Sequence, residues 1–189
     1  MVGRWRTQQL NPMKHILLLL AFLPPAIFAQ QFVTREGNVH FLSETPIEDI
    51  EATSSEASVI LDLETGRVAV QVPILSFHFE KALMEEHFNE NYMESGQFPK
   101  AKFQGNLVDF QGLSASGSQT VSVVGSFEVH GVSVERTFEG TLEQSGDGVQ
   151  LSCRFDVATA DHEIPIPSVV RENIAESISV DINALLSPR

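Results

Sequence analysis

The candidates for acid–base chemistry in this chain are one histidine and the two carboxylates that flank it. Asp161, His162 and Glu163 combine a group that titrates near neutral pH with two carboxylates, which are the residue types of a general acid–base site. In an extended strand, side chains alternate between faces, so Asp161 and Glu163 would point away from His162. The chain carries no nucleophile elbow, phosphate-binding loop or zinc-protease motif. The sequence therefore predicts no catalytic residues and no enzymatic activity.

Metal and redox chemistry are not expected either. Five histidines outside the N-terminal segment lack the i, i+4 or His-x-His spacing of zinc ligands: His40, His78, His87, His130 and His162. Cys153 is the only cysteine, which excludes an intramolecular disulfide and a C-x-x-C exchange site. It shares its strand register with apolar residues, where a lone cysteine acts as a small apolar side chain. We predict no metal and no cofactor.

Three basic residues are candidates for contact with a charged or polar ligand group. Arg136 takes the inward register between Val134 and Phe138, where a charge is costly unless it is paired. Either Arg136 points into a wide cavity and meets a polar headgroup, or a strand bulge turns it out to water. Lys100 and Lys102 are further candidates for an anionic headgroup, although exposed lysines are usually solvated.

The element that precedes these lysines is a helix in a chain that otherwise reads as strands. Met84, Phe88 and Tyr92 recur at i, i+4 and i+8, with Leu83 beside them, so one apolar stripe faces inward. The pattern ends at residues 95–96, Ser-Gly, where a glycine can adopt positive φ. Proline at position 99 then favours an extended backbone into a strand over residues 101–107.

Strands account for most of the remaining chain. Alternation of apolar and polar residues over 121–129 and 132–142, with His130-Gly131 between them, predicts an antiparallel hairpin. A second hairpin pairs residues 58–62 with 67–72 through a turn at 63–66. Further strands are expected at 39–42, 149–157 and 178–185, and Ser168 is a candidate cap for one helical turn. Glycines 105, 125 and 140 interrupt inward faces, which indicates strand curvature or room for a ligand.

These elements predict a mainly β fold with one or two short helices. Antiparallel strands with one apolar face each either stack as a sandwich or close into a barrel. The alternation does not decide between the two. The abundance of phenylalanine at inward positions favours an eight-stranded barrel, whose interior holds side chains or one small ligand.

The N-terminal segment predicts export. Basic residues precede an apolar run that ends near Ala29, as in a secretory signal peptide, and the run is too short to span a membrane. Met1 or Met13 is the start. We expect a signal peptide over residues 1–29, one domain over residues 30–189, and a location in the periplasm or outside the cell.

Without residues 1–29, which hold three of the twelve basic residues and no acidic one, the formal charge changes from −13 to −16. Such acidity excludes nucleic acid as a partner.

A family resemblance joins these features. The order H-F-N, Y-M-E-S and F-P-K-A-x-F-x-G within residues 87–105, with the Ile-Pro-Ile-Pro run before the last strand, resembles the YceI family of secreted lipid-binding proteins. The resemblance implies a lipocalin-like barrel whose long cavity holds a polyisoprenoid chain, such as an isoprenoid quinone or a polyprenyl lipid.

From this resemblance we expect a carrier or reservoir for a polyisoprenoid or a similar long apolar lipid. The alternative is a ligand-free barrel or sandwich that binds a protein partner in the cell envelope. The residues expected to contact the lipid are Phe77, Phe79, Met84, Phe88, Phe103, Val123, Phe127, Val134, Arg136, Phe138, Phe155 and Ile182. The sequence does not identify the lipid, its length, its donor and acceptor, or the oligomeric state.

Overall fold

The structure is a computed structural model that describes residue 3 and residues 31–114 and 117–189. Apart from residue 3, the expected signal peptide lies outside the described residues. Within the described ranges, the fold is built from eight long strands: β1 (Gln31–Glu44), β2 (Asp49–Asp62), β3 (Arg67–Pro73), β5 (Lys100–Val108), β6 (Ser118–Val129), β7 (Val132–Ser145), β8 (Gly148–Ala158) and β9 (Ser177–Pro188).

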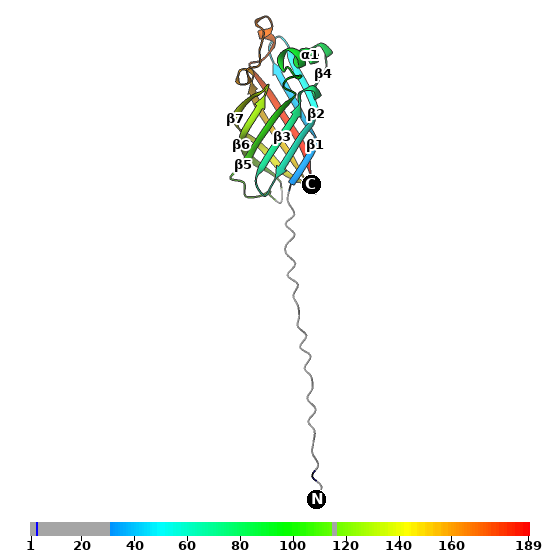
Figure 1. Ribbon diagram of the computed structural model, residues 1–189, viewed down its shortest axis with the longest axis vertical. Helices are drawn as coiled ribbons and strands as arrows, with labels where there is room; N and C mark the ends of the chain where they lie inside the picture. Colours follow the sequence, from blue (N-terminus) through cyan, green and yellow to red (C-terminus); the bar gives the residue numbers. More distant parts are fainter. Residues whose placement is uncertain (1–2, 4–30, 115–116) are drawn as a thin grey trace.

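The eight strands close into an antiparallel barrel (Figure 1). Each strand pairs with its neighbours in the order β1-β2-β3-β5-β6-β7-β8-β9, and β9 pairs with β1. A two-residue strand, β4 (His78–Phe79), adds to the edge of β2 at Ala52 and Thr53. Closure gives each of the eight long strands a partner on both sides over at least part of its length. The predicted eight-stranded barrel is confirmed, and the sandwich is excluded.

The hairpin of β6 and β7 has the predicted turn. Val129 pairs with Val132, and the two residues between them, His130 and Gly131, have φ values of 50° and 77°. Positive φ at both central positions is the geometry of a two-residue turn that matches the twist of the flanking strands. The alternation therefore continues without a break from one strand into the other.

The first two strands are much longer than the sequence predicts. The expected strands at 39–42 and 58–62 are parts of the fourteen-residue strands β1 and β2. The pairing of β1 with β2 shifts register between Thr34 and Gly37 and again between Gly37 and Val39. Such bulges place two residues opposite one, so the apolar alternation is lost although the pairing continues.

The α-helical part of the expected helix is short. Helix α1 (Ala82–His87) continues directly as a π-helix, η2 (Phe88–Tyr92). The residue that adopts positive φ after it is Glu94, at 42°, and not Gly96 as predicted. Leu83 is 61% exposed, so it lies outside the inward stripe that Met84, Phe88 and Tyr92 form.

Three 3-10 helices complete the described fold: η1 (Ile74–Ser76), η3 (Thr159–His162) and η4 (Ser168–Asn173). The expected cap at Ser168 is wrong, because Pro167 holds the N-cap position of η4 and no side chain caps that helix. Within the helical turn, Val169 is 88% exposed. Helix α1 and the segment that holds η4 lie at one end of the barrel, and the C-terminus lies at the other (Figure 1).

The end of the barrel near the C-terminus is packed solid. There Phe32 pairs with Leu61 and Pro188, and Val149 pairs with Leu186. The buried side chains that fill this end are at most 9% exposed: Phe32, Val59, Leu61, Leu142, Val149, Ala184 and Leu186. We call this set the plug. These side chains are part of the larger buried cluster of the fold.

Two glycines let β5 and β6 approach each other closely. Gly105 lies directly opposite Gly125, and a Cβ atom at Gly125 would collide with the backbone of Gln104. The space above Gly105 is occupied by the ring of Phe103, which lies 2.6 Å from where its Cβ would be. These glycines therefore permit the close approach of the two strands, and the Phe103 ring fills the space above Gly105.

Candidate functional site: an apolar cavity

The half of the barrel that holds α1 contains a cavity of about 380 Å³. Its wall is formed by the inward faces of the strands, by α1 and η2, and by η4 with the segment before it. Ten of the twelve residues expected to contact a ligand line it: Phe77, Phe79, Met84, Phe88, Phe103, Val123, Phe127, Phe138, Phe155 and Ile182. Their contact with a lipid stays a prediction.

Four phenylalanines form the cavity wall next to the helix. Phe41, Phe77, Phe79 and Phe88 come from β1, the η1–β4 segment and η2, and their ring centroids lie 5.0 to 5.8 Å apart in five pairs. The rings meet at tilted, edge-to-face or offset angles, which are the favoured arrangements of aromatic pairs. The cluster joins the helix to the barrel through apolar contact.

A second group of phenylalanines lies on the opposite strands. Phe103, Phe127, Phe138 and Phe155 project from β5, β6, β7 and β8, and the Phe138 and Phe155 rings have centroids 4.4 Å apart. Because each residue sits at an inward position of its strand, the four rings converge inside the barrel. Aromatic surface therefore faces the cavity from both sides.

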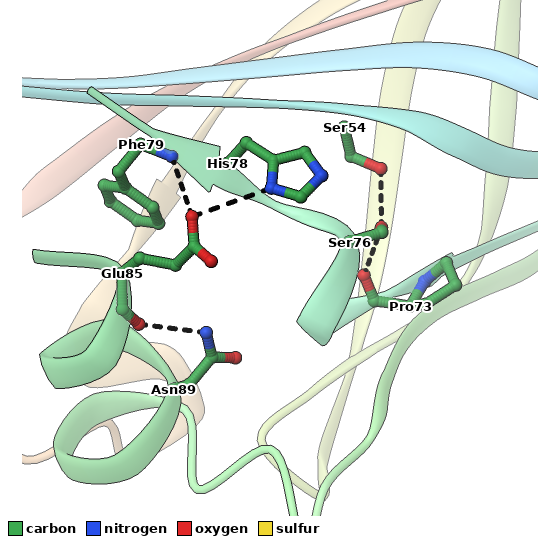
Figure 2. Close-up of polar contacts among 7 residues, drawn as sticks. All are labelled: Ser54, Pro73, Ser76, His78, Phe79, Glu85 and Asn89. Carbon is green, nitrogen blue, oxygen red and sulfur yellow. Dashed lines mark hydrogen bonds and ion pairs between the residues drawn. The ribbon is translucent and has the colours of Figure 1, made fainter. Parts of the chain in front are cut away.

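Polar contacts attach the helix to the barrel (Figure 2). The Oε2 atom of Glu85 accepts a hydrogen bond from the backbone N–H of Phe79 at 3.2 Å and lies 3.6 Å from Nδ1 of His78. Since β4 pairs with β2, this carboxylate ties α1 to the wall of the barrel. Inside the helix, the Nδ2 atom of Asn89 donates to the carbonyl of Glu85.

The segment before β4 is held by two serine hydroxyls. Ser76 donates to the carbonyl of Pro73 at 2.7 Å, and its hydroxyl lies 2.6 Å from that of Ser54 (Figure 2). Both serines are buried, so each needs such a partner. These bonds fix the turn η1, which carries Phe77 into the aromatic cluster.

Three segments meet at the helical end of the cavity. The carboxylate of Glu48, between β1 and β2, accepts a hydrogen bond from Nζ of Lys81 at 2.9 Å, at the start of α1. This bond lowers the pKa of Glu48, to which a hydrogen bond from Asn173 of η4 also contributes, and raises the pKa of Lys81. The hydroxyl of Ser43 accepts a bond from the backbone N–H of Ala175 at 2.8 Å. Glu48 and Asn173 line the cavity.

Two of the expected contact residues, Val134 and Arg136, do not line the cavity. Both keep the predicted register, since Val134 pairs with Phe127 and Arg136 with Gly125, and no bulge interrupts β7 there. However, β7 pairs with β8 only over residues 140–145. Outside this range a gap separates the two strands, and Arg136 lies in it. Arg136 donates to the carbonyl of Asp156 at 2.9 Å and lies 3.4 Å from Asp161. Its charge is thus paired within the wall.

Two of the acid–base candidates, Asp161 and His162, bind different partners beside the same gap. His162 is fully buried in η3, a 3-10 helix and not a strand, and its Nδ1 atom donates to the carbonyl of Val132 at 3.1 Å. Asp161 is exposed and contacts Arg136. The buried His162 therefore has a structural role: it binds a backbone carbonyl and helps to fill the gap between β7 and β8, which we call the seam. Its neighbour Asp161 pairs with Arg136 instead.

The remaining candidates for polar or redox chemistry are Cys153, Lys102 and Lys100. Cys153 lines the cavity as expected, and burial raises the pKa of its thiol to about 11. Lys102 lines the cavity but is paired with Glu128 at 2.7 Å, and Lys100 is exposed. Among the described residues, no group of three or more potential metal ligands comes together.

Sequence reasoning missed part of the cavity wall. Further lining residues include Phe41, Met93, Ile164, Ile166, Val170, Ile174, Ile178 and Val180. The alternation of β9 already placed Ile178 and Val180 on the face of Ile182. The isoleucines on either side of Pro165 and Pro167 show no regular period, so only the fold brings them to the cavity.

Comparison with known proteins identifies relatives of this barrel. The model of the YceI-like domain matches residues 31–186. Among solved structures, a polyisoprenoid binding domain from Saccharophagus degradans is 13% identical and has a TM-score of 0.73, with 85% of this chain and 99% of that chain covered. BcnA of Burkholderia cenocepacia is 14% identical with a TM-score of 0.67, and 80% and 96% of the two chains are covered.

The YceI protein of Campylobacter jejuni is a further structural neighbour, 11% identical with a TM-score of 0.59, over 77% of this chain and 88% of that chain. At these identities the likeness shows a shared fold. No curated protein is a significant sequence match. None of the helices in residues 31–114 and 117–189 has the length and hydropathy needed to cross a membrane.

Proposed function

This chain belongs to the YceI-like family, and on that basis we propose that it binds a polyisoprenoid or similar long apolar lipid inside the barrel, as a carrier or reservoir and not as a catalyst. The observation that carries the proposal is an aromatic-lined cavity of about 380 Å³ in a barrel whose other end is tightly packed. Protein interiors hold few voids larger than a water molecule. A space of this size and chemistry is typical of a ligand site.

The ligand class follows from the lining. Phenylalanine, valine and isoleucine side chains offer almost no hydrogen bonds, so binding energy must come from apolar area removed from water, at about 25 cal/mol per Å² before ordering costs. A long branched hydrocarbon chain suits this wall. The structural neighbour from Saccharophagus degradans is a polyisoprenoid binding domain, which supports the same ligand class here.

Lipid extraction tests the proposal. We expect organic solvent to release an isoprenoid lipid from the purified protein in a near-stoichiometric amount, identified by mass spectrometry. Protein stripped of lipid is expected to rebind a polyprenol with saturation at one molecule per chain. A protein that is empty as purified and that also fails to bind added polyprenol would contradict the proposal and favour a partner-binding barrel.

We further propose that the chain is exported and cleaved after Ala29, which leaves the barrel in the periplasm or outside the cell. The basic and apolar pattern of residues 4–29 supports this. Expression of the full chain, followed by cell fractionation and N-terminal sequencing, is expected to give an exported protein that begins at Gln30. An uncleaved chain that stays in the cytoplasm would contradict it.

A further inference from the structure

Two side chains at the helical end of the cavity carry hydrogen-bond donors that are not used within the described part of the protein. His87 and Tyr92 lie on the same wall as Met84 and Phe88, on α1 and the π-helix that continues it, and both line the cavity. In the described part of the chain, neither side chain has a hydrogen-bond or ion-pair partner. Each carries an N–H or O–H donor. π-Helical segments are rare and often mark functional sites.

Positive charge, in contrast, is not available to a ligand there. Lys102 is the one lysine or arginine among the lining residues in the described ranges, and Glu128 pairs with it at 2.7 Å. Lys81 is bound to Glu48, and Arg136 is bound within the seam between β7 and β8. The carboxylate that does line the cavity is that of Glu48, which stays ionised because Lys81 and Asn173 hydrogen-bond it.

An anionic headgroup would therefore meet no compensating cation. It would lose hydration on entering without gaining an unpaired cation, because Glu48 and Glu128 already pair with Lys81 and Lys102, and this weakens binding. An uncharged headgroup that accepts hydrogen bonds does not need such a cation. It gains a bond from Tyr92 or His87 at an end of the cavity where such donors are otherwise unused.

We propose that this barrel selects isoprenoid lipids with an uncharged, hydrogen-bond-accepting headgroup, an alcohol or a quinone, over their phosphorylated forms. Tyr92 and His87 receive the headgroup, and Glu48 occupies Lys81 so that this cation does not pair with phosphate. The inference rests on the proposed function, since it assigns the headgroup of the lipid whose chain fills the cavity.

A panel of four detergent-solubilised lipids tests the selectivity of the stripped protein: squalene, a polyprenol, the monophosphate of that polyprenol, and an isoprenoid quinone. Dissociation constants are measured by displacement of a fluorescent apolar probe. We expect the phosphate to bind at least tenfold more weakly than the alcohol. Equal affinity for alcohol and phosphate would overturn the selectivity while leaving the proposed function intact. Failure of all four lipids to bind would overturn the proposed function itself.

Two variants assign the roles. Tyr92→Phe removes the hydroxyl and keeps the ring, so affinity for the alcohol or the quinone is expected to fall about threefold to tenfold, the value of one neutral hydrogen bond. Affinity for squalene, which has no headgroup, is expected to stay unchanged. An equal loss for squalene would show that Tyr92 supplies only apolar contact.

Glu48→Gln is expected to raise affinity for the phosphate severalfold without changing that for squalene. Glu86→Gln removes an equal charge from an exposed site on α1 that does not line the cavity, and it is the matched control. Lys81→Met breaks the same ion pair but keeps the carboxylate, so it is expected not to improve phosphate binding. A gain in Lys81→Met equal to that in Glu48→Gln would refute the idea that Glu48 weakens phosphate binding by occupying Lys81. Thermal melting verifies that each variant is folded.

Discussion

At the scale of single residues, burial controls the reactivity of Cys153. Its thiol lines the cavity with a pKa of about 11, because burial disfavours the thiolate and Asp181 adds a like charge. About one molecule in a thousand carries the reactive thiolate at pH 8. We expect a disulfide reagent to modify the native protein far more slowly than the protein unfolded in urea, and polyprenol to slow the reaction further. Equal rates for native and unfolded protein would show that the thiol is open to solvent.

The same residue gives stability a defined pH dependence. In the unfolded chain the thiol loses its proton near its ordinary pKa of 9.0, whereas the folded protein holds the proton up to about 11. Between these values the folded state binds more protons, so stability falls as pH rises from about 9 to about 11. Urea unfolding across this range checks the slope against Cys153→Ala, in which this contribution is expected to be absent. A slope unchanged by that substitution would contradict it.

Residue positions were predictable where the strand register alone decides them. Phe103, Phe127, Phe138 and Phe155 reach the cavity because their strands alternate regularly. Arg136 has the same register and is excluded, because β7 and β8 part beside it and offer a carbonyl and a carboxylate. The separation of β7 from β8 depends on the distance between the two strands. The alternation of apolar and polar residues carries no information about that distance.

At the scale of elements, β5 and β6 depend on a glycine that no other residue can replace. A methyl group at Gly125 would collide with the backbone of Gln104 and with Gly105 opposite. Gly125→Ala is therefore expected to cost more than about 3 kcal/mol, the upper part of the usual range for single substitutions. Gly96→Ala is the control, since nothing lies within 4 Å of its Cβ position and its φ is not positive. Urea unfolding measures both. A tolerated Gly125→Ala would show that the two strands can separate at little cost.

Element boundaries were less predictable than element types. The hairpin of β6 and β7 follows from alternation and its His-Gly turn, whereas β1 and β2 extend through polar stretches that alternation does not reveal. Bulges and a closed barrel satisfy their backbone groups, so the strands need no apolar residue at every second position. The helix ends at Tyr92 because Glu94 adopts positive φ, a conformation that sequence rules assign to glycine first.

At the scale of the whole molecule, the barrel divides into the buried plug and the cavity that we propose as the lipid site. Alternation showed that an apolar interior exists, but it did not show that β9 returns to β1, and closure is what separates a cavity from a sandwich core. Leu142 is 1% exposed in the plug, and Phe88 lies in the cavity wall on the helix. The two residues therefore allow stability and binding to be changed separately.

Leu142→Ala is expected to lower the free energy of unfolding of the lipid-free protein by about 2 to 5 kcal/mol, because it leaves a void among packed side chains. Phe88→Ala is expected to cost less than about 3 kcal/mol without lipid, since the ring already borders empty space and its loss opens little new void. Urea unfolding of both variants and the wild type, without added lipid, measures these costs.

Saturating lipid separates the two halves further. Lipid that binds only the folded state stabilises it by about 2.7 kcal/mol at a hundredfold excess over the dissociation constant. We expect Leu142→Ala to keep this full gain, because its side chain does not touch the cavity, and Phe88→Ala to lose much of it, because four aromatic rings meet at its position. Repeating the unfolding curves with polyprenol measures the gain. If the gain in Phe88→Ala matched the wild type while Leu142→Ala lost it, the lipid would have to bind at the plug, and the cavity beside the helix would not be its site.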